Sequence, residues 1–203
     1  LAIEHNDLDA AADHLSSSAQ LGEHMGLPQH PYRWRVATAR LHEARGDLVT
    51  ALELLTEAGA RYNTDYSPSA RPVTAVTARV EIELGRLDAG ARWAEANRLS
   101  AGDELSYVRE FEHLTLAHLL LARGSPHGIE RAIGLLRRLL TAAADGRRFG
   151  SAVEILVLLA RAQHTAGDET EATASLEEAL VRAKPEGYVR TFLEAGPTVT
   201  GLL

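Results

Sequence analysis

Apolar residues recur along most of the chain at intervals of three and four, the spacing that places them on one face of an α-helix. Short polar turns interrupt these runs, and each turn has an apolar helical run before and after it. The turns lie at Asn6-Asp7, Gly46-Asp47, Gly85-Arg86 and Gly167-Asp168. Helix–turn–helix units with a period of about 40 residues predict a helical solenoid, in which each repeat stacks on its neighbours.

The pattern shows no internal domain boundary. We therefore predict a single all-α domain over residues 1–203, a helical-hairpin solenoid forming a right-handed superhelix of about ten helices in four to five repeats. Segments of helical pattern include 32–45, the run from Asp103 to about Ala122, 153–159 and 188–195, with a loop at 62–68. Small residues lie a few positions after the breaks, where paired helices should approach closely: Ala11, Ala51, Ala91, Ala132 and Ala172.

The composition fits this fold and narrows the function. Of the 203 residues 45% are hydrophobic and only 5% aromatic, and the net charge is −7. An acidic chain without a basic stripe is not expected to contact nucleic acid directly. The absence of cysteine excludes disulfides, thiol catalysis and cysteine-ligated zinc. No apolar run is long enough to span a membrane and no signal-peptide pattern is present, so we expect no membrane partner.

Catalytic motifs are also absent from the sequence. It has neither a His-Glu-x-x-His zinc motif nor a Gly-x-Ser-x-Gly nucleophile turn. The closest pair of histidines on one predicted helix, His113 and His118, is five residues apart and diverges around the helix, so we expect no metal site. The sequence therefore favours a recognition module over an enzyme.

Glu112 stands out as a candidate contact. Helical spacing places it on an apolar stripe, where a carboxylate is costly unless it is paired or hydrogen-bonded. It either contacts a ligand or a neighbouring domain, or it bonds to Arg109 or another group nearby. His113 follows it but points about 100° away around the helix.

Six further residues are candidates, again with a binding role and a structural role as alternatives. Glu154 lies in the most apolar helix and either contacts a ligand or pairs with Arg161 or with an arginine of the preceding helix. Tyr188 and Arg190 either receive an anionic ligand or a linker, or cap the end of the solenoid. Arg109 is a candidate contact together with Glu112 and His113, and is also a possible partner of the Glu112 carboxylate. Trp34 and Trp93 are either platforms for a sugar ring or core residues.

Three segments resemble a known family. They are 109–117 (REFEHLTLA) followed by 119–122 (LLLA), then 154–160 (EILVLLA), then 185–190 (PEGYVR) with Phe192-Leu193 and Gly196-Pro197. In order and spacing they resemble the MalT-like, TPR-like helical-repeat domain of the large ATP-binding LuxR-type transcription regulators. One departure is Gly124-Ser125-Pro126, which replaces the Gly-Asp turn.

The resemblance implies a domain that senses an effector and transmits the signal inside a cytoplasmic bacterial regulator. It implies a small-molecule inducer or a regulatory protein as partner, with sugars as one precedent. It also implies a nucleotide-binding module upstream, where ATP would bind, and a helix-turn-helix domain downstream. The sequence has no phosphate loop and no basic recognition helix. It starts without Met and stops at Gly201-Leu202-Leu203, so we expect a fragment of a larger regulator.

A protein–protein scaffold whose groove binds a peptide or a partner helix is the alternative function. A small-molecule sensor should have a deep, partly closed pocket with a few converging polar groups, whereas a scaffold should have an open groove. The sequence does not place side chains on either face of the solenoid. It also leaves the oligomeric state open, because exposed terminal repeats can pair into a homo-oligomer.

Overall fold

The computed structural model describes residues 1–25, 29–61, 69–196, 199 and 201. Within these residues the structure is entirely helical, which confirms the predicted fold class. The predicted loop at 62–68 and the terminal Leu202-Leu203 lie outside the described residues. The helices are α1 (Leu8–Met25), α2 (His30–Ala44), α3 (Leu48–Ala60), α4 (Val73–Glu83), α5 (Leu87–Ala96), α6 (Glu110–Arg123), α7 (Pro126–Asp145), α8 (Phe149–Thr165), α9 (Glu169–Ala183) and α10 (Arg190–Glu194), with short 3₁₀ turns at Tyr107–Arg109 and Lys184–Glu186.

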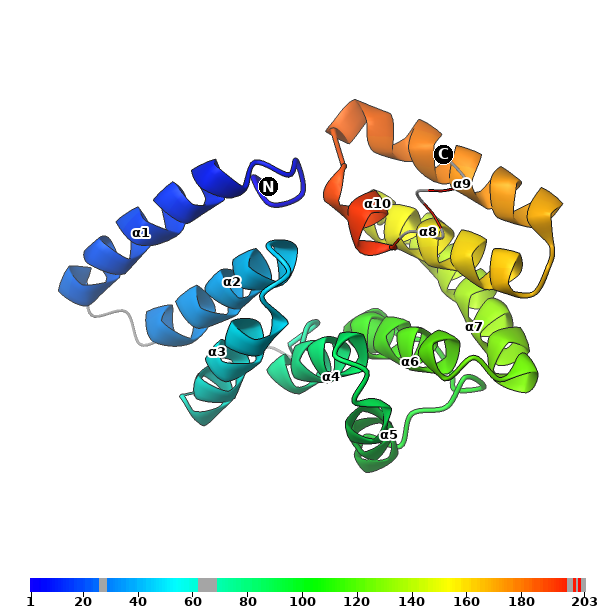
Figure 1. Cartoon of the computed structure of the whole chain (residues 1–203), viewed down its shortest axis with the longest axis horizontal. Coiled ribbons are helices and arrows are strands. Elements are labelled where there is room, and N and C mark those ends of the chain that lie inside the picture. The colour runs from blue at the N-terminus through cyan, green and yellow to red at the C-terminus, as the bar shows by residue number, and fades with distance from the viewer. Residues whose placement is uncertain (26–28, 62–68, 197–198, 200, 202–203) are drawn as a thin grey trace.

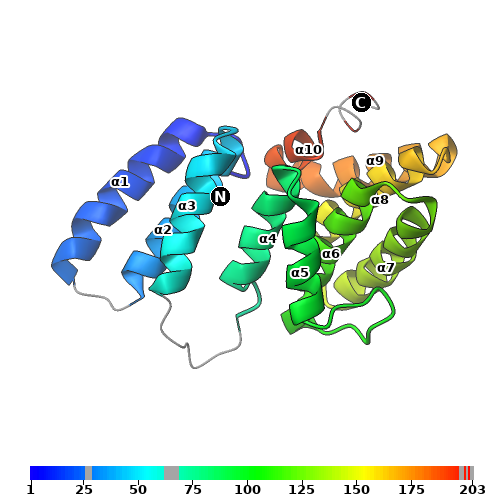
Figure 2. The same cartoon turned by 60° about the horizontal axis from the view of Figure 1, so that its bottom comes forward.

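The helices pair in sequence and follow one another around an arc (Figures 1 and 2). The pairs α2/α3, α4/α5, α6/α7 and α8/α9 pack as hairpins, and α4 also packs against both α3 and α6. Figure 1 shows α2, α4, α6 and α8 along the inner side of the arc, with α3, α5 and α9 outside them. One set of helices therefore forms a concave wall, as expected of a solenoid.

The recurring turn has a local cause. Its first residue adopts a left-handed conformation, with φ of 81° at Gly46 and 84° at Gly167, which glycine reaches without steric cost. The aspartate that follows starts the next helix, because its carboxylate accepts a hydrogen bond from a backbone amide three residues on. Asp47 accepts from Thr50 N at 3.1 Å and Asp168 from Glu171 N at 3.3 Å. The Gly-Asp pair thus ends one helix and caps the next.

The variant turn between α6 and α7 uses the same geometry with different residues. Gly124 has a φ of 66°, and the Ser125 hydroxyl accepts a hydrogen bond from Gly128 N at 3.1 Å. Serine replaces aspartate as the cap, and Pro126 occupies the first helical turn, where its missing N–H costs nothing.

The sequence predicts that five alanines lie where paired helices approach closely, and four of the five are buried. Ala11, Ala51, Ala132 and Ala172 are buried, whereas Ala91 is only half-buried. In α5 the neighbouring Gly90 is the buried residue instead: a Cβ at this position would lie 2.7 Å from Ile82 Cγ1 of α4. An alanine at this position would therefore require the Ile82 side chain to shift.

The helix predicted from Asp103 to about Ala122 was wrong at its start. The α-helix α6 begins at Glu110, after a 3₁₀ turn at Tyr107–Arg109. The Asp103 carboxylate instead accepts a hydrogen bond from Ser100 N at 2.9 Å, which closes a local turn, and Ser106 is extended. Residues 103–106 therefore precede the helix.

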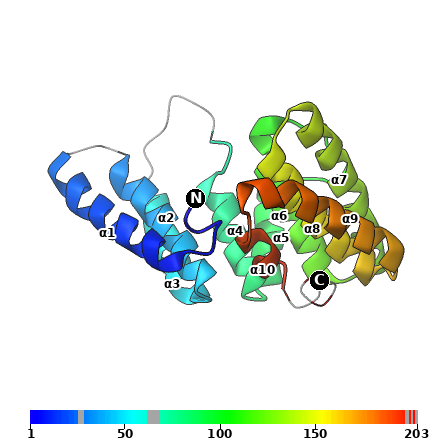
Figure 3. The same ribbon diagram turned by 90° about the horizontal axis from the view of Figure 1, so that it is seen from above.

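The first and last parts of the described chain touch. We call the contact between residues 4–6 and 186–190 the terminal junction. Figures 1 and 3 show the N-terminal segment on the same side as the segment that leads into α10, and Figure 3 shows the two next to each other. The backbone amides of Val189 and Arg190 both donate to Glu4 O at 3.0 Å. Arg190 Nη1 also donates to Asn6 Oδ1 at 3.3 Å. The arc is thereby closed into a ring, which nearest-neighbour stacking alone would not produce.

Candidate ligand pocket

A cavity of about 370 Å³ lies within this ring. Helices α2, α4, α6, α8 and α10 all contribute to its wall, and Glu4 adds the N-terminal segment. Its size falls within the range of small-molecule sites. The lining residues are Glu4, Tyr32, Arg33, Val36, Ala37, Arg40, Glu43, Arg71, Val76, Arg79, Glu83, Phe111, His118, Glu154, Val157, Leu158, Thr191, Glu194 and Ala195.

An ion pair joins the two sides of the cavity. Arg79 of α4 donates from Nη1 to Glu154 Oε1 of α8 at 2.7 Å. Both side chains are largely buried, with 13% and 21% of their surface exposed. Burial alone would raise the pKa of Glu154, but the positive charges of Arg79 and Arg71 outweigh it and lower the pKa to about 2. Glu154 is therefore ionised at neutral pH and depends on its arginine.

Phe111 of α6 gives this arginine a second contact. The guanidinium of Arg79 lies 4.2 Å from the centre of the Phe111 ring, and that of Arg71 lies 5.1 Å from it. Both distances are within the range of cation–π attraction. Nε and Nη2 of Arg79 are buried and have no hydrogen-bond partner among the described residues. The guanidinium of Arg79 in the pocket wall therefore has two hydrogen-bond donors without an acceptor in the described part of the chain.

The terminal junction takes part in the same wall. Arg40 of α2 donates to Glu4 Oε1 at 2.7 Å, just where Glu4 also receives the backbone amides of α10. Burial opposes the charge on Arg40, but the hydrogen bond with Glu4 and its negative charge prevail, so the pKa of Arg40 is raised. Opening the junction would therefore expose one side of the pocket.

Carboxylates gather at the ends of α2 and α4. The carboxylates of Glu43 and Glu83 form no hydrogen bond or ion pair within the described residues, and Glu194 of α10 is close enough to act on both. The loss of hydration in the hollow, followed by repulsion from Glu43, raises the pKa of Glu83 to about 7. Desolvation and Glu194 also raise the pKa of Glu43. Arg79 and Arg190 offset part of this repulsion, but neither forms an ion pair with Glu43 or Glu83.

His118 lies between these groups on α6. Burial and the nearby Arg79 lower its pKa to about 3, so its imidazole is neutral at physiological pH. Within the described residues no three acidic or histidine side chains are placed to hold a metal ion. No helix in the part of the chain that the structure describes is long and apolar enough to cross a membrane.

Of the candidate contact residues chosen from the sequence, only Glu154 lines the pocket. His118, considered there only as a metal ligand, lines it as well. The predicted partners of Glu154 were wrong: it pairs with Arg79 of α4, since the solenoid brings α4 opposite α8. Arg190 lies just behind the wall and donates to Glu194 Oε1 at 2.9 Å. Tyr188 packs on the C-terminal core, where a Cβ at Gly150 would lie 3.3 Å from its hydroxyl.

Arg109, Glu112 and His113 form a separate network at the start of α6. Arg109 donates to Glu112 Oε2 and to Asn97 O, both at 2.9 Å. The fully buried His113 bonds through Nδ1 to Arg109 O at 2.9 Å. These bonds satisfy the Glu112 carboxylate and fix the segment before α6. A binding role for the three residues stays a prediction.

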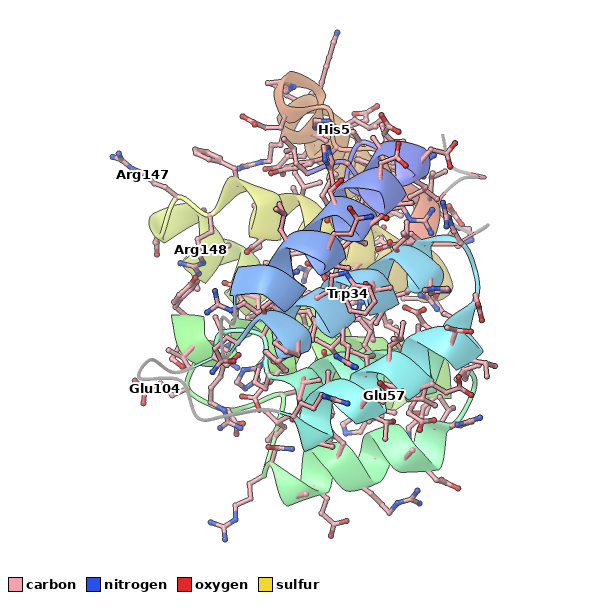
Figure 4. The ribbon with its side chains drawn as sticks, turned by 90° about the vertical axis from the view of Figure 1, so that its left-hand side faces the viewer. His5, Trp34, Glu57, Glu104, Arg147 and Arg148 are labelled. Carbon is pink, nitrogen blue, oxygen red and sulfur yellow. The ribbon has the colours of Figure 1, made fainter. Side chains whose placement is uncertain are left out.

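The tryptophans lie outside the cavity lining. Trp34 sits between α1 and α2 and donates from Nε1 to Leu15 O at 2.9 Å (Figure 4). Trp93 packs against two of the apolar clusters of the core. Figure 4 also shows Arg147 extending away from the molecule, whereas Arg148 turns inward and bonds Glu110 at 2.7 Å. The two tryptophans pack between helices, Arg148 forms an ion pair, and none of these side chains lines the pocket.

Sequence reasoning missed Arg79, Phe111 and Glu83. On α4 the residues Val76, Arg79 and Glu83 recur at three and four positions, so a signal was present. Charged residues at such spacing are usually a solvated helix face. The charged residues of α4 line a cavity because the arc closes on itself, and a local sequence pattern does not predict that closure.

A chain of paired helices that stack into an arc is a helical-hairpin solenoid of the TPR type. The chain belongs to the family of MalT-like TPR regions, because the sequence model of that family matches residues 1–203. No curated protein and no solved structure matches the chain.

The uncompensated charge of Glu83 has a consequence for stability. Its pKa is higher in the folded than in the unfolded chain, so the folded state binds more protons between pH 4.5 and about 7. Its contribution to stability is therefore present at low pH and is lost as the pH rises through about 7. We expect Glu83→Gln to raise the melting temperature at pH 8 and to have no such benefit near pH 4.5.

Melting curves across this pH range, compared with the unsubstituted chain, provide the measurement. The matched control is Glu177→Gln, an exposed carboxylate on α9, which should leave the pH profile unchanged. A Glu83→Gln effect that is the same at both pH values would contradict the electrostatic account.

Proposed function

We propose that this domain is the effector-sensing and signal-transducing part of a LuxR-type, ATP-dependent transcription regulator of the bacterial cytoplasm, and that a small molecule binds in the pocket. The observation that carries the proposal is the cavity of about 370 Å³, whose wall combines apolar side chains with converging arginine and glutamate side chains. A partly closed pocket favours a small effector over a peptide in an open groove.

The terminal junction offers a route for the signal. Thr191 and Glu194 of α10 line the pocket, and α10 is held against Glu4 by backbone hydrogen bonds. A ligand that contacts both sides stabilises the closed arrangement by its difference in affinity for the closed and open forms. The resulting shift would reach the nucleotide-binding and helix-turn-helix modules expected of such a regulator.

A thermal-shift screen of this chain against sugars, amino acids, nucleotides and other small metabolites tests the proposal. A ligand at about 100 times its dissociation constant should add about 2.7 kcal/mol of stability. We expect a dose-dependent rise in melting temperature that Arg71→Gln weakens and Glu177→Gln leaves intact. If the folded chain responds to no compound of the panel, a regulatory protein as effector becomes the better hypothesis, and a pull-down with partner proteins is the next test.

A further inference from the structure

Some charged groups in the pocket form ion pairs with other described residues of the protein, and others do not. Arg40 pairs with Glu4 and Arg79 pairs with Glu154, each at 2.7 Å. After these pairs, cationic and anionic groups remain unpaired along the same helices. The buried groups among the unpaired ones are Nε and Nη2 of Arg79, which have no partner within the described residues. Buried polar groups are normally hydrogen-bonded, so these donors point to a bound partner. Arg71 and Glu83 are exposed and Glu43 is half-buried, so water solvates them in the empty pocket.

The cationic groups are Arg71, which precedes α4, and Arg79, which lies one turn before Glu83 within α4. Arg71 lines the pocket and has no hydrogen bond or ion pair within the described residues, its guanidinium facing the Phe111 ring. Arg79 stands over the same ring with Nε and Nη2 unpartnered. Two guanidinium groups beside one aromatic ring suit a carboxylate, which arginine binds with charge-assisted hydrogen bonds.

The anionic groups lie at the C-terminal ends of α2 and α4. Glu43 ends the pocket-facing side of α2, and Glu83 is the last residue of α4. Both line the cavity. Glu194 of α10 also lines it, but its carboxylate is already paired with Arg190 at 2.9 Å. A metal ion is not the fitting partner, because no three such side chains within the described residues are placed to hold one. An organic ammonium group suits them, since it can bond several carboxylates that do not meet at one point.

We propose that the pocket binds a small zwitterion of the amino-acid class, with its carboxylate at Arg71 and Arg79 and its ammonium group beside Glu43 and Glu83. This inference rests on the proposed sensory function and specifies its ligand. The two ends of the zwitterion match the two sets of unpaired groups, and the aliphatic part passes Val36 and Val76 between them. A neutral ligand would leave both sets of charges unsatisfied.

The repulsion among the carboxylates adds to the argument. Burial and mutual repulsion raise the pKa values of Glu43 and Glu83 in the empty pocket. An ammonium group removes that repulsion, whereas a second anion would increase it. Both charges of the ligand are therefore recognised, and a molecule with only one of them should bind weakly.

The test is isothermal titration calorimetry of this chain with the protein amino acids and with ω-amino acids from β-alanine to 6-aminohexanoate, because the latter vary the distance between the two charges. The zwitterion that binds best is then compared with its matched amine and carboxylate; for γ-aminobutyrate these are n-butylamine and butyrate. We expect the loss of either charge to weaken binding at least about tenfold, the size of one lost charge-assisted hydrogen bond.

Variants locate the two ends of the ligand. Glu83→Gln should weaken the zwitterion about tenfold while leaving the weak binding of butyrate unchanged. Arg71→Gln should weaken the zwitterion similarly while leaving n-butylamine unchanged. Glu177→Gln on α9 is the control for both and should bind the zwitterion as the unsubstituted chain does.

The outcomes separate the two proposals. Binding of a neutral sugar without binding of any zwitterion overturns this inference but leaves the sensory function standing. Equal binding of the zwitterion and its single-charge analogue also overturns it. If neither the zwitterions nor any other small molecule binds the folded chain, both this inference and the small-molecule sensor fail.

Discussion

Replacing Arg79 with methionine should lower the free energy of unfolding by about 3–5 kcal/mol. Methionine preserves much of the aliphatic volume, so the main loss is the positive charge 2.7 Å from Glu154. The Glu154 carboxylate would be left between apolar residues of α8 without its partner, and an uncompensated buried charge is costly. Urea unfolding at pH 7 measures the change.

Two further variants show whether the charge is responsible. Arg79→Met combined with Glu154→Gln should recover much of the lost stability, because the carboxylate is no longer charged. Arg182→Met is the matched control: Arg182 bonds Glu178 at 2.6 Å, but on the solvent side of α9, where an ion pair contributes only about 0–1 kcal/mol. Equal losses from Arg79→Met and Arg182→Met would be incompatible with a special role of the pocket pair.

Replacing Phe111 with alanine should cost about 3–5 kcal/mol as well, for a different reason. The ring is 7% exposed and belongs to the apolar cluster that α2, α3 and α4 form. Its removal leaves a cavity in that cluster and takes away the surface on which Arg71 and Arg79 lie. Chemical denaturation again gives the stability change.

The chain offers a matched control for this change too. Phe149 starts α8 and is 61% exposed, so Phe149→Ala should change stability by less than about 0.5 kcal/mol. Phe111→Leu, which retains an apolar side chain, should cost clearly less than Phe111→Ala. If Phe111→Ala and Phe149→Ala were equally mild, the ring would not be part of the packed wall described above.

Much of the fold could be predicted because its signals are local. A glycine with positive φ followed by a capping aspartate, as at Gly46-Asp47, ends one helix and begins the next within a few residues. The start of α6 escaped prediction because Asp103 resembles a helix cap but accepts its bond from Ser100 N, three residues earlier. Which residue a carboxylate caps depends on the backbone around it, and the residue type alone does not decide that.

The pocket was much harder to predict, since its parts are distant in sequence. Glu154 could be noticed as a carboxylate among apolar neighbours, but its partner Arg79 is 75 residues away and on another hairpin. Glu112 gave the same signal and proved to bond Arg109, only three residues away. Burial of a charge can thus be inferred from a single helix, whereas the group that satisfies it depends on the curvature of the whole arc.

The terminal junction changes how a disturbance travels through the molecule. In an open array a displaced repeat disturbs only its neighbours, and the far end is unaffected. Here Glu4 bonds both to Arg40 of α2 and to the backbone of α10, so the two ends of the array share one residue. A pull on α10 is therefore transmitted to the first repeats without passing through the helices between them. By thermodynamic linkage, the force needed to open the ring should grow with any ligand that bridges it.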